Sequence, residues 1–127
     1  DAALGVVTSH HYSAAHGSAA NKAFVAAFGK ANNGMRPNFM AVGGYDGMHA
    51  IAQVVKALDG KIDADKAMAL FKQMKFESPR GPIAIDPETR DIVQTVYVRR
   101  VEKRDGHLYN VEFDSFPAVK DPGKQAQ

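Results

Sequence analysis

Three histidines near the beginning of the sequence are the side chains best suited to chemistry. His10, His11 and His16 lie close together, and imidazole rings both bind metals and move protons near neutral pH. A metal site needs converging ligands, usually with a carboxylate or a thiolate among them. No acidic residue is close to them in sequence, the chain has no cysteine, and His10 and His11 would point apart in an extended segment. We therefore expect loop histidines, with neither a metal nor another cofactor.

A second group of polar residues could form a proton relay. Tyr45, Asp46 and His49 would lie on one side of a helix, although an Asp–His pair three residues apart more often forms an exposed polar contact. The glycine-rich stretch 43–47 falls inside a helical pattern, so it lacks the context of a dinucleotide-binding loop. The sequence also contains no serine nucleophile elbow, no phosphate-binding loop and no zinc-protease motif. We expect no enzymatic activity.

The stretch 37–58, which carries these groups, is expected to form the longest helix. Apolar residues recur along it with helical spacing. Its first residue, Pro37, suits the first helical position, and the Asp-Gly pair that follows the stretch suits its end. Gly43, Gly44 and Gly47 each cost about 1 kcal/mol relative to alanine inside a helix. Three such residues indicate that a large neighbour, either another backbone or a ligand, lies against that face.

The remaining pattern alternates strands and helices without completing a sheet. A lone strand followed by three helices lacks the parallel strands of a doubly wound sheet, so we expect a piece of a longer protein. The predicted elements are a buried strand over 4–8, a polar loop over 9–13, helices over 18–32 and 64–75, an irregular segment over 78–82, a short strand over 83–85, and a hairpin of strands 92–101 and 107–115 joined at Asp105-Gly106.

Composition argues against several classes of partner. The 16 basic and 14 acidic residues give a formal net charge of +2, which is too balanced to indicate nucleic acid or an anionic membrane. The hydrophobic content of 45% is ordinary for a soluble globular protein, and no apolar run reaches membrane-spanning length. A chain of 127 residues is long enough for one domain of ordinary size.

A set of stretches, taken together and in order, carries a family resemblance. The stretches are GVVTSHHY at 5–12, NKAFVAAF at 21–28, YDGMHA at 45–50, PRGPIAIDP at 79–87 and QTVYVR at 94–99. This set resembles the branched-chain amino acid type of ABC-transporter substrate-binding proteins, which have the type I periplasmic-binding fold. No single stretch is diagnostic, but the ordered set covers nearly the whole sequence.

The resemblance implies an α/β fold of two lobes with a ligand cleft between them. This sequence would be the C-terminal part of that fold and would end in an antiparallel hairpin. Residues 1–35 would belong to the C-terminal lobe, 36–81 to helices of the N-terminal lobe and 82–119 to the C-terminal lobe again, with 120–127 as a loose polar tail. The chain would thus cross between the lobes twice.

The resemblance also implies which residues face the ligand. The family places a side chain from the first turns of the long helix against the ligand, which favours Phe39 or Met40 beside the space left by Gly43. The loop after the first strand would face the ligand from the opposite lobe. The expected ligand-binding residues are Phe39, Met40, Gly43, Tyr45, His11 and Tyr12.

The expected function is capture of a small solute outside the cytoplasmic membrane. The protein would lie in the periplasm, or be lipid-anchored in a Gram-positive source, and would deliver its ligand to an ABC permease after hinge closure. A branched-chain or other amino acid and a flat aromatic acid are equal candidates, since Tyr12 or Tyr45 could stack on an aromatic ring. A ligand-sensing regulatory domain of the same fold is the alternative. The expected partners are the ligand, the permease and the rest of the same protein, and no nucleic acid.

Overall fold

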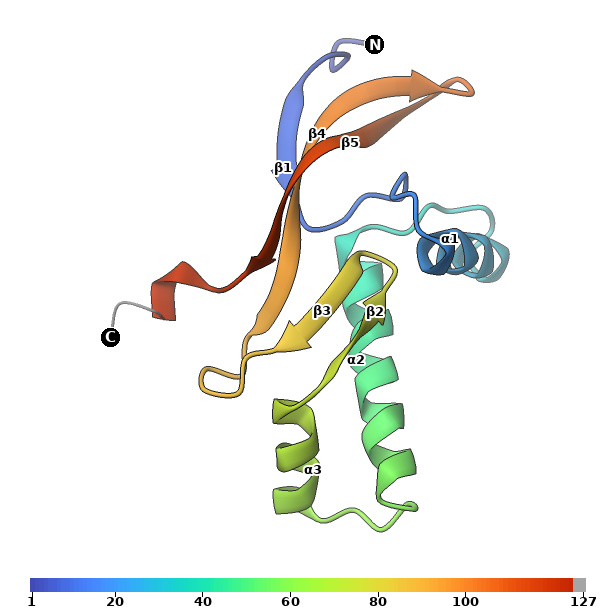
Figure 1. Cartoon of the computed structure of the whole chain (residues 1–127). Coiled ribbons are helices and arrows are strands. Elements are labelled where there is room, and N and C mark those ends of the chain that lie inside the picture. Colours follow the sequence, from blue (N-terminus) through green and yellow to red (C-terminus); the bar gives the residue numbers. More distant parts are fainter. Residues whose placement is uncertain (125–127) are drawn as a thin grey trace.

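The computed structural model describes residues 1–124 and shows a long twisted ribbon of two strands above a group of helices (Figure 1). Among these residues, no helix combines the length and the apolar character that crossing a lipid bilayer requires. The elements are β1 (Val7–His10), α1 (Ala19–Ala31), α2 (Phe39–Ala57), α3 (Ala64–Lys72), β2 (Lys75–Ser78), β3 (Gly81–Ile85), β4 (Ile92–Arg104), β5 (His107–Val119) and the short 3₁₀ helix η1 (Pro122–Lys124).

A five-stranded antiparallel sheet is built around β4. Tyr97 pairs with β1 on one side and β5 on the other, and Gln94 pairs with β3 on one side and β5 on the other. The strands β1 and β3 therefore lie end to end along one edge of β4, while β5 follows the opposite edge. Positive φ angles at Asp105 (49°) and Gly106 (80°) are those of a type I′ turn, which confirms the predicted hairpin.

Polar side chains cap the beginnings of the three α-helices. Ser18, Asn38 and Asp63 each accept a backbone N–H bond from the first turn, which satisfies donors that have no partner inside the helix. The prediction that Pro37 is the first helical residue is therefore wrong. Asn38 caps α2 through two bonds of 3.0 Å, so the proline precedes the cap.

The segment 78–82 is the turn of a hairpin, and the prediction of an irregular break is wrong. Ser78 in β2 pairs with Gly81 in β3. Gly81 has a φ of 95°, and a Cβ there would overlap the Tyr97 hydroxyl, so only glycine fits this position. The strand β2 carries the mostly polar sequence KFES, which hides it from a pattern search and explains why α3 ends earlier than predicted.

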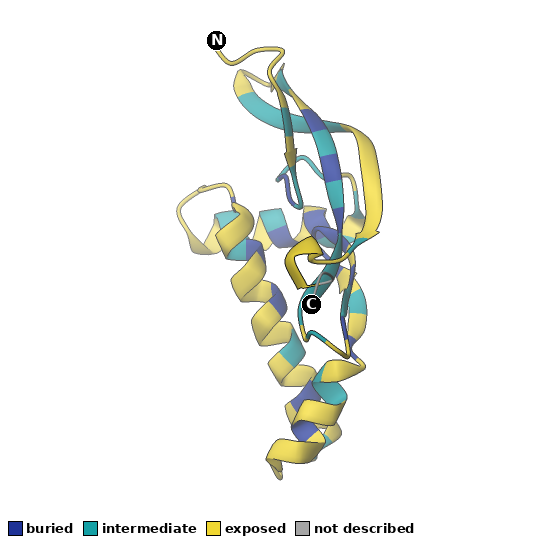
Figure 2. Ribbon diagram, turned by 90° about the vertical axis from the view of Figure 1, so that its left-hand side faces the viewer, coloured by how far each residue is buried: buried dark blue, intermediate teal, exposed yellow. Residues whose placement is uncertain are grey.

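The strand β1 differs from the predicted buried strand over 4–8 in position and in exposure. It begins at Val7 and extends to His10. Leu4 is 44%, Val6 49% and Val7 56% exposed, and this end of the chain is coloured as exposed in Figure 2. Within residues 1–124, β1 pairs with β4 alone, so no second strand covers its other edge.

Two separate clusters form the core, and α2 contributes to both. Phe24 is buried and Phe28 packs against it, which confirms the predicted core face of α1. Figure 2 shows buried residues on the side of α2 that faces the sheet and exposed residues on much of the rest of its surface. One cluster consists of Tyr12, Phe24 and Val42, and the other consists of Val54, Ala67 and Met74.

A buried ion pair lies midway along α2, between the residues of these clusters. Asp46 is 4% exposed and binds Arg80 at 2.7 Å. The predicted exposed pair of Asp46 with His49 is therefore wrong, because the aspartate points toward the β2–β3 turn. The His49 ring instead packs against Phe76, with 4.7 Å between ring centroids.

Candidate functional site

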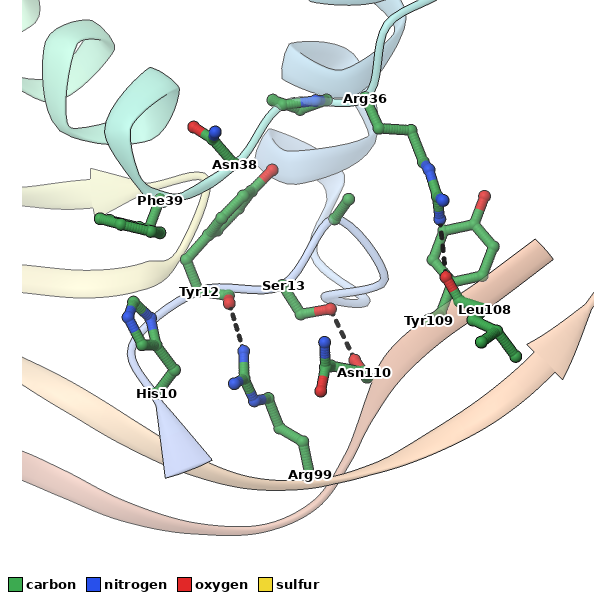
Figure 3. Close-up of a pocket in the computed structure, with 12 residues that line it drawn as sticks. His10, Tyr12, Ser13, Arg36, Asn38, Phe39, Arg99, Leu108, Tyr109 and Asn110 are labelled. Atoms are coloured by element: carbon green, nitrogen blue, oxygen red, sulfur yellow. Dashed lines mark hydrogen bonds between the residues drawn. The ribbon is translucent and has the colours of Figure 1, made fainter. Parts of the chain in front are cut away.

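A pocket of about 440 Å³ lies where the loop after β1, the linker before α2 and the β4–β5 hairpin meet (Figure 3). Its walls carry aromatic rings and two arginines, and no acidic residue lines it. The lining residues are His10, Tyr12, Ser13, Ala14, Arg36, Pro37, Asn38, Phe39, Arg99, Leu108, Tyr109 and Asn110.

Three aromatic side chains gather at one end of this pocket. The rings of His10 and His11 are 4.3 Å apart between centroids, and Phe39 lies 5.0 Å from His10 and 6.3 Å from His11. The expectation that the two histidines point apart is wrong, because the chain bends at His11 where β1 ends. The structure thus brings the loop histidines against the first residue of α2.

The surroundings of both histidines disfavour their protonated forms. Burial and the positive charges of Arg99 and Arg80 lower the pKa of His10. Burial lowers the pKa of His11 to about 4, with further contributions from Arg80, His10 and Arg99. A neutral histidine keeps one N–H donor and one ring acceptor. The cluster therefore offers flat apolar faces and hydrogen-bonding nitrogens in a positive potential, which suits a ligand with an aromatic ring and a negative charge.

The β4–β5 hairpin holds the loop that carries the histidines. The Arg99 guanidinium, on a residue that is 8% exposed, donates to the carbonyl of Tyr12 at 2.6 Å, and the Ser13 hydroxyl donates to the carbonyl of Asn110. Figure 3 shows Arg99 reaching from β4 to the loop. The Nε of Arg99 is buried and has no hydrogen-bond partner in the described part of the chain.

A contact at the other end of the pocket ties the linker to the same hairpin. Arg36 donates to the carbonyl of Leu108 at 2.9 Å, and its guanidinium lies 4.3 Å from the centroid of the Tyr109 ring. A cation over an aromatic face is attracted by the ring quadrupole. The linker before α2, where the chain is expected to cross between the lobes, is therefore held against β5.

The six predicted ligand residues do not all meet in this chain. Phe39 lies against His11, and Tyr12 also lines the pocket. The Tyr12 side chain is only 4% exposed and donates to Asn21 at 3.0 Å, so its ring serves the core as well. The other three lie further along α2 and do not line the pocket. They are Met40, Gly43 and Tyr45.

These three residues have different surroundings. Met40 is 70% exposed, and no atom lies within 4 Å of the position that a Cβ would take at Gly43. Tyr45 is 46% exposed and packs against Phe24, with 4.9 Å between ring centroids. No atom of the described residues lies within 4 Å of the Cβ position at Gly44 or Gly47 either, so the large neighbour expected at this helix face is not found within residues 1–124.

Sequence reasoning missed the two pocket arginines, Arg36 and Arg99, and also Arg80, whose charge acts on His11. Arg99 and Arg80 lie inside the stretches that carry the family resemblance, but neither forms part of a recognisable catalytic or binding motif. The available signal was an arginine at an inward position of the alternating strand β4, whose neighbours Thr95 and Tyr97 are buried. Within the described residues, no three His, Asp or Glu side chains come together as a metal site would require.

Comparison with known proteins identifies close relatives. The sequence matches the model of the periplasmic binding protein family over residues 1–107. The Leu/Ile/Val-binding protein homolog 6 of Brucella abortus (strain 2308) is 47% identical over 127 residues, which cover 98% of this chain and 33% of that protein.

Solved structures agree with this match. A solute-binding protein of an ABC transporter from Rhodopseudomonas palustris BisB5, in complex with 3,4-dihydroxybenzoic acid, is 66% identical with a TM-score of 0.93 and aligns with 98% of this chain and 34% of its own. A second one, from R. palustris HaA2 in complex with p-hydroxybenzoic acid, is 45% identical with a TM-score of 0.90 and aligns with 100% of this chain and 35% of its own.

The chain spans about a third of the length of these relatives. The matches confirm the resemblance seen in the sequence. They also confirm the fold class, because the helices and the antiparallel sheet correspond to the C-terminal part of the type I periplasmic-binding fold. The two aromatic acids were bound to those relatives, 3,4-dihydroxybenzoic acid in the BisB5 protein and p-hydroxybenzoic acid in the HaA2 protein.

Proposed function

This chain belongs to the periplasmic binding protein family, and on that premise we propose that the full-length protein is the solute-binding component of an ABC importer. It works outside the cytoplasmic membrane, either in the periplasm or lipid-anchored at the cell surface, and hands its ligand to a membrane permease. Binding and release involve no bond chemistry. The observation that carries the proposal is the cluster of His10, His11 and Phe39 beside a pocket with two arginines.

We infer that the ligand is a small aromatic carboxylate. Two neutral imidazoles and a phenyl ring offer faces and edges for an aromatic ring, and Arg99 and Arg36 offer positive charge without an acidic residue in the lining. An amino acid also needs an acceptor for its ammonium group, which the described lining supplies only through neutral groups. The relative of highest identity among those compared above was solved with an aromatic acid, which agrees with this preference.

A branched-chain amino acid is the second candidate. The observation in its favour is the 47% identity to a Leu/Ile/Val-binding protein homolog. Residues upstream of this sequence in the longer relatives would then have to bind the ammonium group. A ligand-sensing role of the same fold would use the same cleft but would need no permease.

Ligand capture would proceed by closure of two lobes around a hinge. Residues 1–35 and 82–119 would lie in the C-terminal lobe, 36–81 in the N-terminal lobe, and 120–127 would form a tail. The second buried cluster supports this division, because most of it comes from α2, α3 and β2, which fall within 36–81. The aromatic cluster supports it as well, because Phe39 and the two histidines come from opposite sides of the first expected crossing.

A thermal-shift comparison on the full-length protein tests the ligand class. We expect 4-hydroxybenzoate to raise the melting temperature and its neutral amide, 4-hydroxybenzamide, to have little effect, because the arginines favour the carboxylate. A ligand at a hundred times its Kd adds about 2.7 kcal/mol of stability. A shift with leucine, and none with the aromatic acid, would reject the aromatic assignment in favour of the amino acid.

Two variants locate the site in the same assay. Phe39→Ala should weaken aromatic-acid binding by about tenfold, because it removes a ring that packs against the ligand or its histidine neighbours. Phe116→Ala is the matched control, since Phe116 is 57% exposed on β5 and does not line the pocket. Equal weakening by both variants would show that Phe39 has no particular part in binding.

A further inference from the structure

Arg80 connects three elements at the centre of the molecule. Its Nε donates to the Asp46 carboxylate on α2 at 2.8 Å, and its NH2 lies 2.7 Å from the same oxygen. Its NH1 donates to the side chain of Gln94 on β4 at 2.9 Å. Its backbone carbonyl accepts the Tyr97 hydroxyl of β4 at 2.9 Å. Arg80 is 8% exposed, so it joins α2 to β4 from a buried position in the β2–β3 turn.

The two halves of the aromatic cluster are carried by those same two elements. Phe39 is the first residue of α2, two turns before Asp46. His10 ends β1, which pairs with β4, and the loop that follows with His11 is held on β4 by the bond from Arg99 to the Tyr12 carbonyl. The distance between Phe39 and the histidine rings therefore depends on how α2 sits on β4. Arg80 makes the side-chain connection that fixes this arrangement midway along the helix.

We propose that Arg80 is a positioning residue where the two expected lobes meet: it anchors the middle of α2 on β4 and thereby sets the separation of Phe39 from the histidine rings when the lobes close. The inference rests on the proposed function, since it assigns a role to Arg80 in ligand binding at that site. Arg80 would affect ligand binding without contacting the ligand, because it acts through α2 and β4.

Stability alone does not account for this arrangement. Burying a charged pair carries a desolvation penalty that often equals or exceeds the attraction gained. Apolar residues of similar size frequently stabilise a fold to the same extent. A planar guanidinium, by contrast, fixes direction, because its donors form a rigid fork. Here the fork spans Asp46 and Gln94, which belong to the two elements whose relative position matters for the site.

Replacing Gln94 separates positioning from folding. Gln94→Met removes the bond from Arg80 to the β4 side chain and leaves the buried Asp46–Arg80 pair complete, so no charge loses its partner. Gln53→Met is the matched control, because Gln53 is an exposed residue of α2 and the change in chemistry is identical. Both variants are made in the full-length protein.

Two readouts are compared, one without ligand and one with it. Hydrogen exchange of the ligand-free protein should become about tenfold faster at backbone amides 39–46 in Gln94→Met, the effect of losing one hydrogen bond to a charged group. The Kd for 4-hydroxybenzoate should rise by a similar factor, mainly through faster dissociation. The control should match the unmodified protein in both measurements, and the melting temperatures of all three should be close.

Unchanged exchange in Gln94→Met would overturn the inference, and so would an unchanged Kd. If the unmodified protein bound no aromatic acid while exchange still increased in Gln94→Met, the proposed ligand would be wrong and the positioning of α2 by Arg80 would stand. An equal effect in Gln53→Met would also overturn the inference, because it would show a general loss of order in α2.

Discussion

His11 has the most unusual environment of the residues in the candidate site. It is half-buried between His10 and Phe39, and three basic side chains lie near enough to disfavour its protonation. Its ring is therefore a neutral aromatic group where an isolated histidine would be partly charged in mildly acidic solution. The site gains a flat face for a ligand and keeps its positive charge on the arginines.

This environment predicts how stability depends on pH. The pKa of His11 is about 4 in the folded protein and about 6.5 in an unfolded chain. Between these values the unfolded state binds more protons, so stability falls as pH decreases from about 6.5 to about 4. The slope from this one residue should be well below its limit of about 1.4 kcal/mol per pH unit, because His11 is partly exposed.

Urea unfolding of the full-length protein at several pH values between 7 and 4 measures this effect. His11→Gln should flatten the pH dependence in that window. His107→Gln, a change at an exposed position at the start of β5, is the control for the loss of a histidine as such. An identical slope in the His11 variant and the unmodified protein would show that His11 titrates alike in the folded and unfolded states.

Individual site residues were predictable only where a family pattern names them. Phe39, His11 and Tyr12 were expected near the ligand, and the structure brings these three together. Arg80 and Arg99 were not expected, because their partners are distant in sequence: Asp46 precedes Arg80 by 34 residues and Tyr12 precedes Arg99 by 87. Periodicity describes one element at a time and gives no information on such contacts.

Among the elements, α2 depends most clearly on a single capping residue. Asn38 accepts two backbone N–H bonds of 3.0 Å at the start of the helix, and the first turn contains no acidic residue. The same turn carries Phe39 into the aromatic cluster. The cap therefore supports both the helix and the position of a site residue.

Two substitutions of Asn38 should change the free energy of unfolding in opposite directions. Asn38→Ala should lower the free energy of unfolding of the full-length protein by about 1 kcal/mol, because two donors lose their acceptor. Asn38→Asp should keep the cap and add a favourable interaction of a few tenths of a kcal/mol with the helix dipole. Urea unfolding distinguishes the two, and equal stabilities in both variants would show that the side chain does not cap α2.

The elements themselves were largely predictable, and the exceptions have physical causes. Helical periodicity located all three helices, and the Asp-Gly pair located the β4–β5 turn. The strand β2 was missed because its mostly polar sequence has no apolar alternation. The strand β1 was expected to be buried because it is apolar, yet burial depends on neighbouring strands that a local pattern does not contain.

At the scale of the whole molecule, the exposed face of α2 is the main unexplained surface of the chain. Met48 is 64% and Ile51 47% exposed, with Met40 about two turns before Met48 at 70%. Gly44 and Gly47 lie on the same stripe, with no atom of the described chain near either. Apolar side chains flanking small residues are typical of a helix face that packs closely against another element.

We expect the remainder of the full-length protein to cover this face, as the proposed position of 36–81 in the N-terminal lobe requires. Gly47→Ala should then destabilise the full-length protein by about 1–3 kcal/mol through overpacking. On an open helix surface the same change would stabilise it by up to about 1 kcal/mol. Gly29→Ala in α1 is the control, since its Cβ would meet only an ordinary contact of 3.8 Å.

A stabilising effect of Gly47→Ala, measured by urea unfolding, would contradict the placement of α2 in the N-terminal lobe. The division into lobes was inferred from the family resemblance, because composition and periodicity give no sign of it. The overall fold class was likewise predictable from the family resemblance. The cleft was predictable only in part, since about two thirds of the length of the relatives lies outside this sequence.

The most direct test of the account is a calorimetric titration of the full-length protein with 4-hydroxybenzoate, with leucine titrated in parallel. The account predicts saturable binding of the aromatic acid at one site per molecule, weakened in Phe39→Ala, and no measurable heat with leucine. Saturable binding of leucine together with no binding of 4-hydroxybenzoate or 3,4-dihydroxybenzoate would contradict the claim that this site receives an aromatic carboxylate.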